Sequence, residues 1–393
     1  MLLLYVERKY FMEKITAFFL SIIMAFSQFF GLAGDSNYER MTNLKESLKV
    51  LFSKNEVISQ QHTGTVSEEK WSADEVFSFD NTIMLKKEKG RDFKILTLSD
   101  IHFSDFGYRA FLSVFNVNKI KRLVATNQPD LILILGDIVC GDNSDYYSIQ
   151  RITDLMESFG VPWAPVFGNH DDEVNCDLNF LADIMMQSPH CLMQKGDPEM
   201  GVGNYIINIA ENGRIVESLF MMDSHHNQPN EKQHEWFKWA TDGINRLTDN
   251  GSEISLYMHI PIPEYRYAYD EAWNADKKKW NTEYNAYGSL HESVACERDG
   301  EGNPVQRGFF DLVKASGTTK YIFCGHDHMN DFSIEYDGVR LTYMMKLGMA
   351  SGFQFGFDGG SIITVGSTGI KRITHKTLSF GPLVKIVDID TTK

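Results

Sequence analysis

Five short polar motifs in this sequence carry carboxylate, imidazole and carboxamide side chains, which bind metal ions through oxygen and nitrogen. The motifs are Asp100-Ile101-His102, Gly136-Asp137, Gly168-Asn169-His170-Asp171, His259 and Gly325-His326-Asp327-His328. Donors of these types suit divalent ions such as manganese, zinc or iron, and no thiolate is required. The motifs therefore predict a metal centre built from residues that are far apart in the chain.

Each motif follows an apolar run with the composition of a buried strand. The runs are residues 95–98, 131–135, 166–167, 254–258 and 321–323. Ligand sites in open α/β sheets form just beyond the carboxyl ends of the strands, so the motifs are expected to converge on one crevice. A lone histidine at a strand end is more often a capping or surface residue, and Gly-Asp is also a common turn signal. Five motifs in succession, each behind a strand, argue against that alternative.

The elements that must position these motifs alternate between strands and helices, which is typical of a mostly parallel α/β arrangement. Strands are expected at 93–99, 130–135, 162–167, 253–258 and 320–324, and helices near 114–126, 146–159, 177–187, 231–248 and 309–315. Residues 205–210 and 215–223 form a predicted hairpin through Glu211-Asn212-Gly213, and residues 332–386 are strand-rich. The pattern predicts two sheets in one domain, sandwiched by helices.

The chain divides into three predicted parts. Residues 1–33 contain an apolar run from Ile15 to Ala33, typical of a signal peptide, with an uncleaved membrane anchor as the alternative. Either predicts a secreted or extracytoplasmic protein. Residues 34–90 are a predicted linker with lead-in strands, and residues 91–393 form the domain that carries the motifs. Within it, residues 264–307 are an aromatic, polar insertion without clear periodicity, and long loops of this kind are usually functional.

Composition limits the partners more than the chemistry. The 393 residues are 43% hydrophobic and 23% charged, as in an ordinary soluble domain, with a formal net charge of −15. An acidic surface repels phosphate backbones, so duplex nucleic acid is not expected as a partner. A small phosphorylated substrate is compatible with this charge, because bound cations reverse the local field. The five cysteines are scattered and do not predict a disulfide framework.

The order Asp-x-His, Gly-Asp, Gly-Asn-His-Asp, a lone His and Gly-His-x-His resembles the signature of the calcineurin-like metallophosphoesterases, over roughly residues 91–350. The resemblance implies a four-layer α/β/β/α sandwich, in agreement with the two predicted sheets. It implies that one divalent ion is held by Asp100, His102, Asp137 and His328. It implies that a second is held by Asp137, Asn169, His259 and His326. Asp137 would then bridge the two ions.

The resemblance also implies the reaction. Two cations about 3.5–4 Å apart clamp a phosphate and activate a bridging hydroxide, which attacks phosphorus in line with the leaving oxygen. His170 is the expected proton donor to that oxygen. Asp171 either orients His170 or caps the following helix. Asn169 and His170 are also expected to contact the substrate, as is His226, for which a solvated turn is the alternative.

Within the family, the closer likeness is to the branch related to purple acid phosphatases in fungi, plants and bacteria. The residues that carry it are Asp223-Ser224, Gln233, Trp236, the stretch from His259 to Tyr265, and the stretch from Gly325 to Asp331. True purple acid phosphatases have an iron-binding tyrosine where this chain has Cys140, and they lack a histidine at His102. This departure favours two divalent ions, or an iron held without tyrosinate. Cys140 is either a thiolate ligand or a small buried residue.

The expected activity is hydrolysis of phosphomonoesters, with a phosphorylated small molecule or a phosphoprotein as substrate. A phosphodiesterase acting on nucleotides or lipid head groups is one alternative, and a non-catalytic binding protein on the same fold is another. Aromatic residues that open the insertion, such as Tyr265 and Tyr269, either wall the substrate pocket or pack over the sheet. Asn330 and Asp331 are expected to support the last two histidines.

Overall fold

The computed structural model describes residues 63–67, 70–105, 107–140, 146–225, 227–349, 351–352, 357–378 and 383–392. These all belong to one compact unit, Val57–Lys393. The predicted signal or anchor segment 1–33, most of the predicted linker, and His226 lie outside the described residues. No helix in the part of the chain that the structure describes has both the length and the apolar character to cross a membrane.

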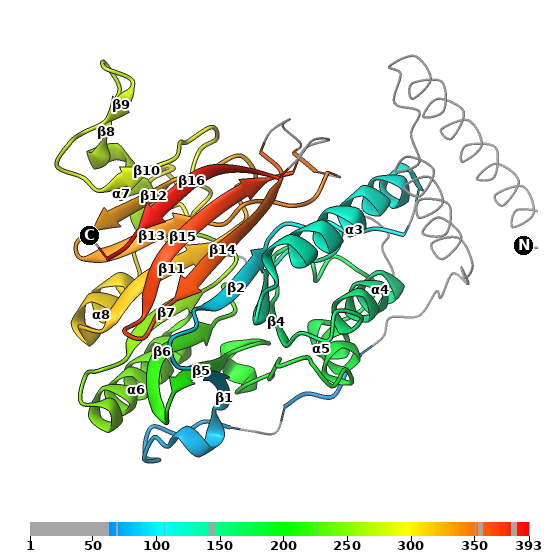
Figure 1. Cartoon of the computed structure of the whole chain (residues 1–393), viewed down its shortest axis with the longest axis horizontal. Helices are drawn as coiled ribbons and strands as arrows, with labels where there is room; N and C mark the ends of the chain where they lie inside the picture. The colour runs from blue at the N-terminus through cyan, green and yellow to red at the C-terminus, as the bar shows by residue number, and fades with distance from the viewer. Residues whose placement is uncertain are drawn as a thin grey trace, which may run out of the picture. The chain divides into compact units, whose positions relative to one another are not determined.

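One of the two large sheets has eight strands, which are labelled in Figure 1. Its order is β1 (Ile83–Lys87), β5 (Tyr205–Glu211), β6 (Arg214–Met221), β7 (Glu253–Tyr257), β11 (Thr319–Cys324), β13 (Val339–Tyr343), β12 (Ser333–Tyr336) and β10 (Ala286–Tyr287). Strands β6, β7, β11 and β13 are parallel to one another. The carboxyl ends of β7 and β11 therefore lie at the same edge of this sheet.

The second large sheet has six strands and contains the first three motif-bearing strands. Its order is β16 (Val384–Asp390), β15 (Ile370–Thr377), β14 (Gly359–Val365), β2 (Phe93–Leu98), β3 (Leu131–Leu135) and β4 (Trp163–Val166). Strands β2, β3 and β4 are parallel, and every residue of β3 and β4 is buried. Burial on both faces explains why these strands are continuous apolar runs in the sequence.

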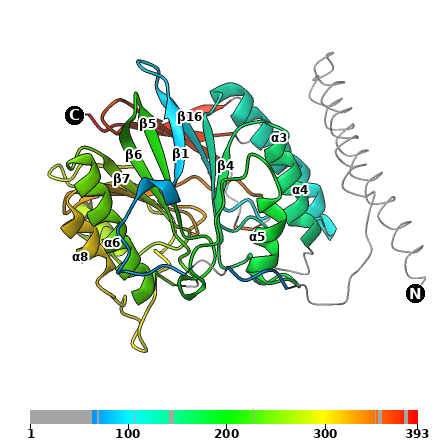
Figure 2. The same ribbon diagram turned by 90° about the horizontal axis from the view of Figure 1, so that it is seen from below.

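Helices cover the outer faces of both sheets (Figure 2). Alongside the six-stranded sheet lie α3 (Gly107–Asn127), α4 (Tyr146–Glu157) and α5 (Leu178–Met186). The other side has α6 (Glu231–Thr248), α7 (Glu264–Ala272) and α8 (Phe309–Ser316), which share one apolar core with β6, β7 and β11. The layers are therefore helices, sheet, sheet and helices, and the predicted α/β/β/α sandwich is confirmed.

Local sequence signals account for several element boundaries. Helix α6 begins with a capping box between Asn230 and Gln233 and ends where Asp249 adopts a left-handed conformation. The predicted hairpin of β5 and β6 turns at Asn212-Gly213, both with positive φ, as a two-residue turn requires. The smaller elements are the 3-10 helices Phe79–Asn81 and Pro198–Met200 and the hairpin of β8 (Trp273–Asn274) with β9 (Lys279–Trp280).

Two regions are more ordered than the sequence indicated. The insertion contains helix α7, whose Tyr265, Ala268 and Ala272 are buried at helical spacing against the eight-stranded sheet. Ahead of the domain, the described part of the predicted linker is fastened to it. Phe77 fills the space over Gly243 of α6, where an added Cβ would overlap its ring. The prediction that the whole insertion is aperiodic is therefore wrong for helix α7, whose aromatic and polar residues obscured the helical period in the sequence.

Candidate metal centre

The five predicted motifs meet where the carboxyl ends of strands from both sheets come together. Asp100, Asp137 and Asn169 follow β2, β3 and β4 of the six-stranded sheet, while His259 and His326 follow β7 and β11 of the eight-stranded sheet. Hydrogen bonds join these loops: the Asp100 N–H donates to the Gly136 carbonyl at 3.2 Å, and the His326 N–H donates to Asp100 Oδ2 at 3.1 Å. The cluster is thus assembled across the two sheets.

Four of these residues have the left-handed backbone that non-glycine residues rarely adopt. The φ angles are 50° at Asp100, 46° at His102, 48° at Asp137 and 72° at His326. Each such residue costs about 1–3 kcal/mol of local strain, which persists only where the surroundings hold it and which is concentrated at functional sites. Here the loops hold each other, because the His102 N–H donates to the Asp137 carbonyl at 2.9 Å.

Glycines directly before the donors allow the close approach of these loops. A Cβ at Gly136 would overlap the imidazole of His259, and one at Gly168 would overlap the backbone and carboxylate of Asp137. A Cβ at Gly325 would overlap the hydroxyl of Ser99. The Gly-Asp, Gly-Asn-His and Gly-His patterns therefore have a steric cause at this site.

The first group of donors surrounds a space beside β2. It consists of Asp100, His102, Asp137 and His328, whose donor atoms all lie within 4.8 Å of one another. His328 Nε2 is 3.1 Å from His102 Nε2 and 3.4 Å from Asp100 Oδ1. His102 Nε2 is 3.5 Å from Asp137 Oδ2. These are the four residues that the resemblance assigns to one ion.

The second group shares Asp137 and adds His259 and His326. His259 Nε2 is 3.3 Å from Asp137 Oδ1 and 3.3 Å from His326 Nδ1. The Nδ1–H of His259 donates to the Leu135 carbonyl at 2.8 Å, which directs Nε2 into the group. Asn169 lies on the loop next to Asp137, because the following amide, of His170, donates to Asp137 Oδ1 at 2.9 Å.

Unsatisfied oxygens test whether these residues fit a metal pair. Asp100 Oδ1, Asp137 Oδ2 and Asn169 Oδ1 are buried and have no hydrogen-bond partner in the part of the chain that the structure describes. A buried polar atom left unpaired costs about 1–3 kcal/mol. All three oxygens belong to residues assigned to the ions, and a cation would satisfy each. The donor set of carboxylates, imidazoles and one amide thus fits two divalent ions that share Asp137.

Burial and charge set the protonation of the histidines. Burial lowers the pKa of His102 to about 3, with the nearby Lys346 charge adding to the effect. Burial, followed by the charge of His259, lowers the pKa of His326 to about 4. Burial would also lower the pKa of His259, but the adjoining Asp137 carboxylate outweighs it and raises the pKa to about 10. Without a bound cation, His102 and His326 are therefore neutral at neutral pH, whereas Asp137 keeps His259 protonated, so His259 must release a proton to bind a cation.

His170 lies at the solvent side of the cluster, with its side chain 38% exposed and its ring centroid 5.4 Å from that of His102. Its Nδ1 is 2.7 Å from Glu173 Oε2. Burial lowers the pKa of His170, but the hydrogen bond to Glu173 and the charge of Asp137 outweigh this and raise it. Glu173 was not singled out in the sequence, although its spacing of three residues from His170 was an available signal.

Asp171 has neither of the two roles considered for it. It is fully buried, and its carboxylate accepts from the Val139 N–H at 3.0 Å and the Gly168 N–H at 2.8 Å. The contact that orients His170 comes from Glu173 instead, and the cap of α5 is Asp177. Asp171 therefore joins the loops that follow β3 and β4, and the prediction that it acts on His170 or on a helix is corrected.

Other predicted site residues occupy different places. Asn330 and Asp331 accept hydrogen bonds from the insertion rather than from the last two histidines. Tyr265 is buried, and its hydroxyl donates to the Ile322 carbonyl at 2.7 Å, so it packs on the sheet and does not wall a pocket. The thiol of Cys140 is buried against the His102 carbonyl at 3.4 Å and belongs to neither donor group, which favours its interpretation as a small buried residue.

A buried lysine close to the cluster was missed. Lys346 is 3% exposed, and its Nζ has no hydrogen-bond partner among the described residues. Burial lowers the pKa of Lys346 to about 8, against the opposing charges of Asp100 and Asp137. Its backbone forms a parallel bridge with Ser99, next to Asp100. Nothing local in the sequence indicates this placement, because it depends on pairing between segments almost 250 residues apart.

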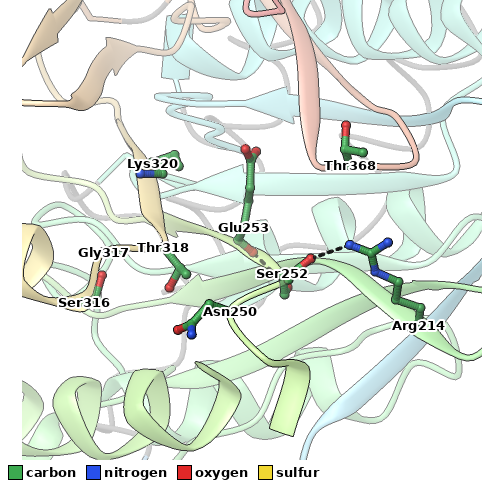
Figure 3. A pocket seen from close by; sticks show the side chains of 10 residues that line it. Arg214, Asn250, Ser252, Glu253, Ser316, Gly317, Thr318, Lys320 and Thr368 are labelled. Carbon is green, nitrogen blue, oxygen red and sulfur yellow. Dashed lines mark hydrogen bonds between the residues drawn. The ribbon is translucent and has the colours of Figure 1, made fainter. Parts of the chain in front are cut away.

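A separate hollow of about 490 Å³ lies at the amino ends of β7 and β11, opposite the ends that carry the donors (Figure 3). Its lining includes Arg214, Glu253 and Lys320. Arg214 is already engaged, because its Nη2 donates to the Gly251 carbonyl at 3.1 Å. None of the predicted donors lines this hollow, so it has no part in the metal centre.

Comparison with known proteins identifies the family. The model for calcineurin-like phosphoesterases matches residues 93–330, more than half of the chain and all five motifs. The chain belongs to the calcineurin-like phosphoesterase family. This family acts on phosphate esters, and the donors of both groups, which include Asp100, Asp137, His259 and His328, lie within the matched residues.

Relatives within this family agree with the likeness to purple acid phosphatases. A probable inactive purple acid phosphatase 29 from Arabidopsis thaliana is 28% identical over 322 residues, 72% of this chain and 78% of that protein. Phosphatase DCR2 from Saccharomyces cerevisiae is 25% identical over 282 residues, 63% of this chain and 46% of that protein.

Among solved structures, a crystal structure of a dimetal phosphatase from Danio rerio aligns with 75% of this chain and 98% of that chain at 11% identity and a TM-score of 0.45.

Proposed function

We propose that this phosphoesterase is a phosphatase that hydrolyses phosphoric monoesters with two divalent ions. The observation that carries the proposal is the pair of donor groups joined by Asp137, with one unsatisfied oxygen each on Asp100, Asp137 and Asn169. When bound, two divalent ions supply electrostatic stabilisation of the phosphoryl oxygens and an activated water nucleophile. Manganese, zinc and iron all suit the donors.

The residues of the chain divide the remaining work. His102 and His328 complete the first donor group, and His259 and His326 complete the second. His170 stands apart from both groups at the solvent side, where a substrate can reach it, and holds a proton for the leaving oxygen. Glu173 orients its ring through Nδ1, so that Nε2 is the atom left to face the substrate. The raised pKa of His170 keeps it protonated closer to neutral pH.

Three relatives from Arabidopsis thaliana are named as probable inactive purple acid phosphatases, so catalysis must be distinguished from binding. A binding protein on this fold needs neither a complete donor set nor a proton donor. This chain has both, since every predicted donor is present and His170 has a carboxylate partner. The yeast relative named as a phosphatase is compatible with catalysis, and we propose phosphorylated small molecules or phosphoproteins as the substrate class.

The test is metal analysis of the purified chain together with turnover of an aryl phosphate monoester and the matching diaryl diester. We expect two ions per chain and faster hydrolysis of the monoester after loading with manganese, zinc or iron. Faster hydrolysis of the diester would contradict the monoester proposal and support a phosphodiesterase. Two bound ions with no hydrolysis of either compound would instead support a binding protein.

A further inference from the structure

Side chains of the segment that carries the last two histidines point in two directions. His326 and His328 face the donor groups, whereas Asp327, Asn330 and Asp331 face the insertion. All three of these polar side chains are buried, at 6%, 3% and 5% exposure respectively. Their partners are backbone N–H groups between Ser289 and Ala295, a stretch without helix or strand. One short loop therefore carries two candidate metal donors on one side and accepts hydrogen bonds from the insertion on the other.

Asn330 makes the most extensive of these contacts. Its Oδ1 accepts from the His291 N–H at 2.9 Å and the Glu292 N–H at 3.1 Å, and its Nδ2 donates to the Glu292 carbonyl at 3.1 Å. A side chain of the insertion also contacts the histidine segment, because Glu292 Oε1 accepts a hydrogen bond from the Met329 N–H at 2.5 Å. An apolar side chain at position 330 would deprive the partly buried N–H groups of His291 and Glu292 of this acceptor.

Asp331 and Asp327 fasten the two ends of the same stretch. Asp331 Oδ1 accepts from the Ser289 N–H at 2.7 Å and from its hydroxyl at 3.1 Å. Asp327, placed between the two histidines, accepts from the Ala295 N–H at 3.1 Å and from the hydroxyl of Tyr343. Residues 289–295 thus hold the histidine loop from Asp327 to Asp331, and neither segment has regular structure to hold it independently.

We propose that Asn330 is a positioning residue, which locks residues 289–295 of the insertion onto the histidine loop and so sets the ion affinity of His326 and His328. This inference rests on the proposed dinuclear function. It predicts coupling in both directions, since hydrogen bonds that restrain the histidines also restrain the insertion. Ion binding should order residues 289–295, although none of them is a predicted ligand, and loss of the Asn330 contacts should weaken ion binding.

The test compares Asn330→Leu with Asn285→Leu in the full chain. Asn285 also lies in the insertion, but its Nδ2 donates to Glu335 on β12, away from the histidine loop. We expect Asn330→Leu to weaken Mn²⁺ affinity by about 10–100-fold, as loss of a residue that supports metal ligands usually does. It should also alter the visible spectrum of the Co²⁺-loaded protein and increase hydrogen exchange in residues 289–295. Asn285→Leu should leave the affinity and the spectrum unchanged.

A second measurement needs no variant. Adding Mn²⁺ to the metal-free wild-type chain should slow hydrogen exchange in residues 289–295. Two bound ions without this protection, or unchanged affinity and Co²⁺ spectrum in Asn330→Leu, would overturn the inference while leaving the proposed function intact. A wild-type chain that binds no ion would instead contradict the proposed function itself.

Discussion

Asp137 is the residue on which both donor groups depend. Its Oδ1 lies 3.3 Å from His259 Nε2, and its Oδ2 lies 3.5 Å from His102 Nε2, so that each oxygen faces a different group. The carboxylate is fully buried, and the left-handed backbone at Asp137 directs it between the two sheets. A single side chain in this position would serve as the shared ligand of two ions.

The contact between Glu173 and His170 predicts a change in pH dependence. A general acid works only while protonated, so activity falls as pH rises through its pKa. The Glu173 carboxylate raises the pKa of His170, and Glu173→Gln removes that charge. We expect the alkaline fall of kcat/KM to move to lower pH in the variant, with a larger loss for alkyl than for aryl phosphates. The measurement is the pH–rate profile with both substrates.

Glu157→Gln is the matched control for that substitution. Glu157 forms the same kind of pair with His190, at 2.6 Å, on elements that carry none of the donors. Its variant should keep the wild-type pH profile. An unchanged profile in Glu173→Gln, or equal losses on alkyl and aryl substrates, would remove the acid role of His170.

At this scale the sequence identified the donors and suggested Asn330 and Asp331 as supporting residues, but it did not identify the partners of these side chains. Asp100, Asp137 and the histidines were recognisable because strand-end motifs repeat one chemical pattern. Asp171 was misassigned because adjacency in sequence suggested contact with His170, whereas the turn at residues 168–171 directs its carboxylate to the backbone of Val139 and Gly168. The contacts of Asn330 with residues 291 and 292, and the burial of Lys346 beside Ser99, depend on distant segments and leave no local pattern.

At the scale of elements, the turn after β3 must bring Asp137 close to β7. Gly136 has φ of 74°, and a Cβ there would overlap the imidazole of His259. Gly136→Ala should therefore lose metal affinity and more than the roughly 1–2 kcal/mol of unfolding free energy that a left-handed alanine costs. Urea unfolding and metal titration of the purified variant measure the two effects.

Gly160→Ala is the control that separates the backbone strain of a left-handed alanine from the steric overlap with His259. Gly160 also has positive φ, at 61°, but nothing lies within 4 Å of an added Cβ. It should show the backbone cost alone and bind metal like the wild type. Equal destabilisation and equal metal affinity in both variants would show that the close approach at Gly136 does not hold the site together.

The elements themselves were predictable where burial was uniform. Strands β3 and β4 are short apolar runs, and the turn Asn212-Gly213 specifies its hairpin, so both were found from local sequence. The insertion was not, because residues 289–295 obtain their order from side chains of residues 327–331. Hydrogen bonds between segments this far apart have no periodic signature.

At the scale of the whole domain, the candidate metal donors come from both sheets, so bound ions would connect them. Asp100, Asp137 and Asn169 extend from the six-stranded sheet, and His259 and His326 extend from the eight-stranded sheet. Chelation should therefore lower the free energy of unfolding. The expected loss is about 4 kcal/mol for a site held at about 1,000 times its Kd, and re-addition of Mn²⁺ should restore it. A denaturation midpoint insensitive to chelator would contradict a metal link between the sheets.

The most direct test of the account is ion content and turnover of Asp137→Asn beside the wild type. The account predicts two ions and metal-dependent monoester hydrolysis for the wild-type chain. For the variant, which removes the shared negative charge from both donor groups, it predicts loss of paired ion binding and turnover at background, in a chain that remains folded by circular dichroism. Near wild-type turnover in purified Asp137→Asn would contradict the account.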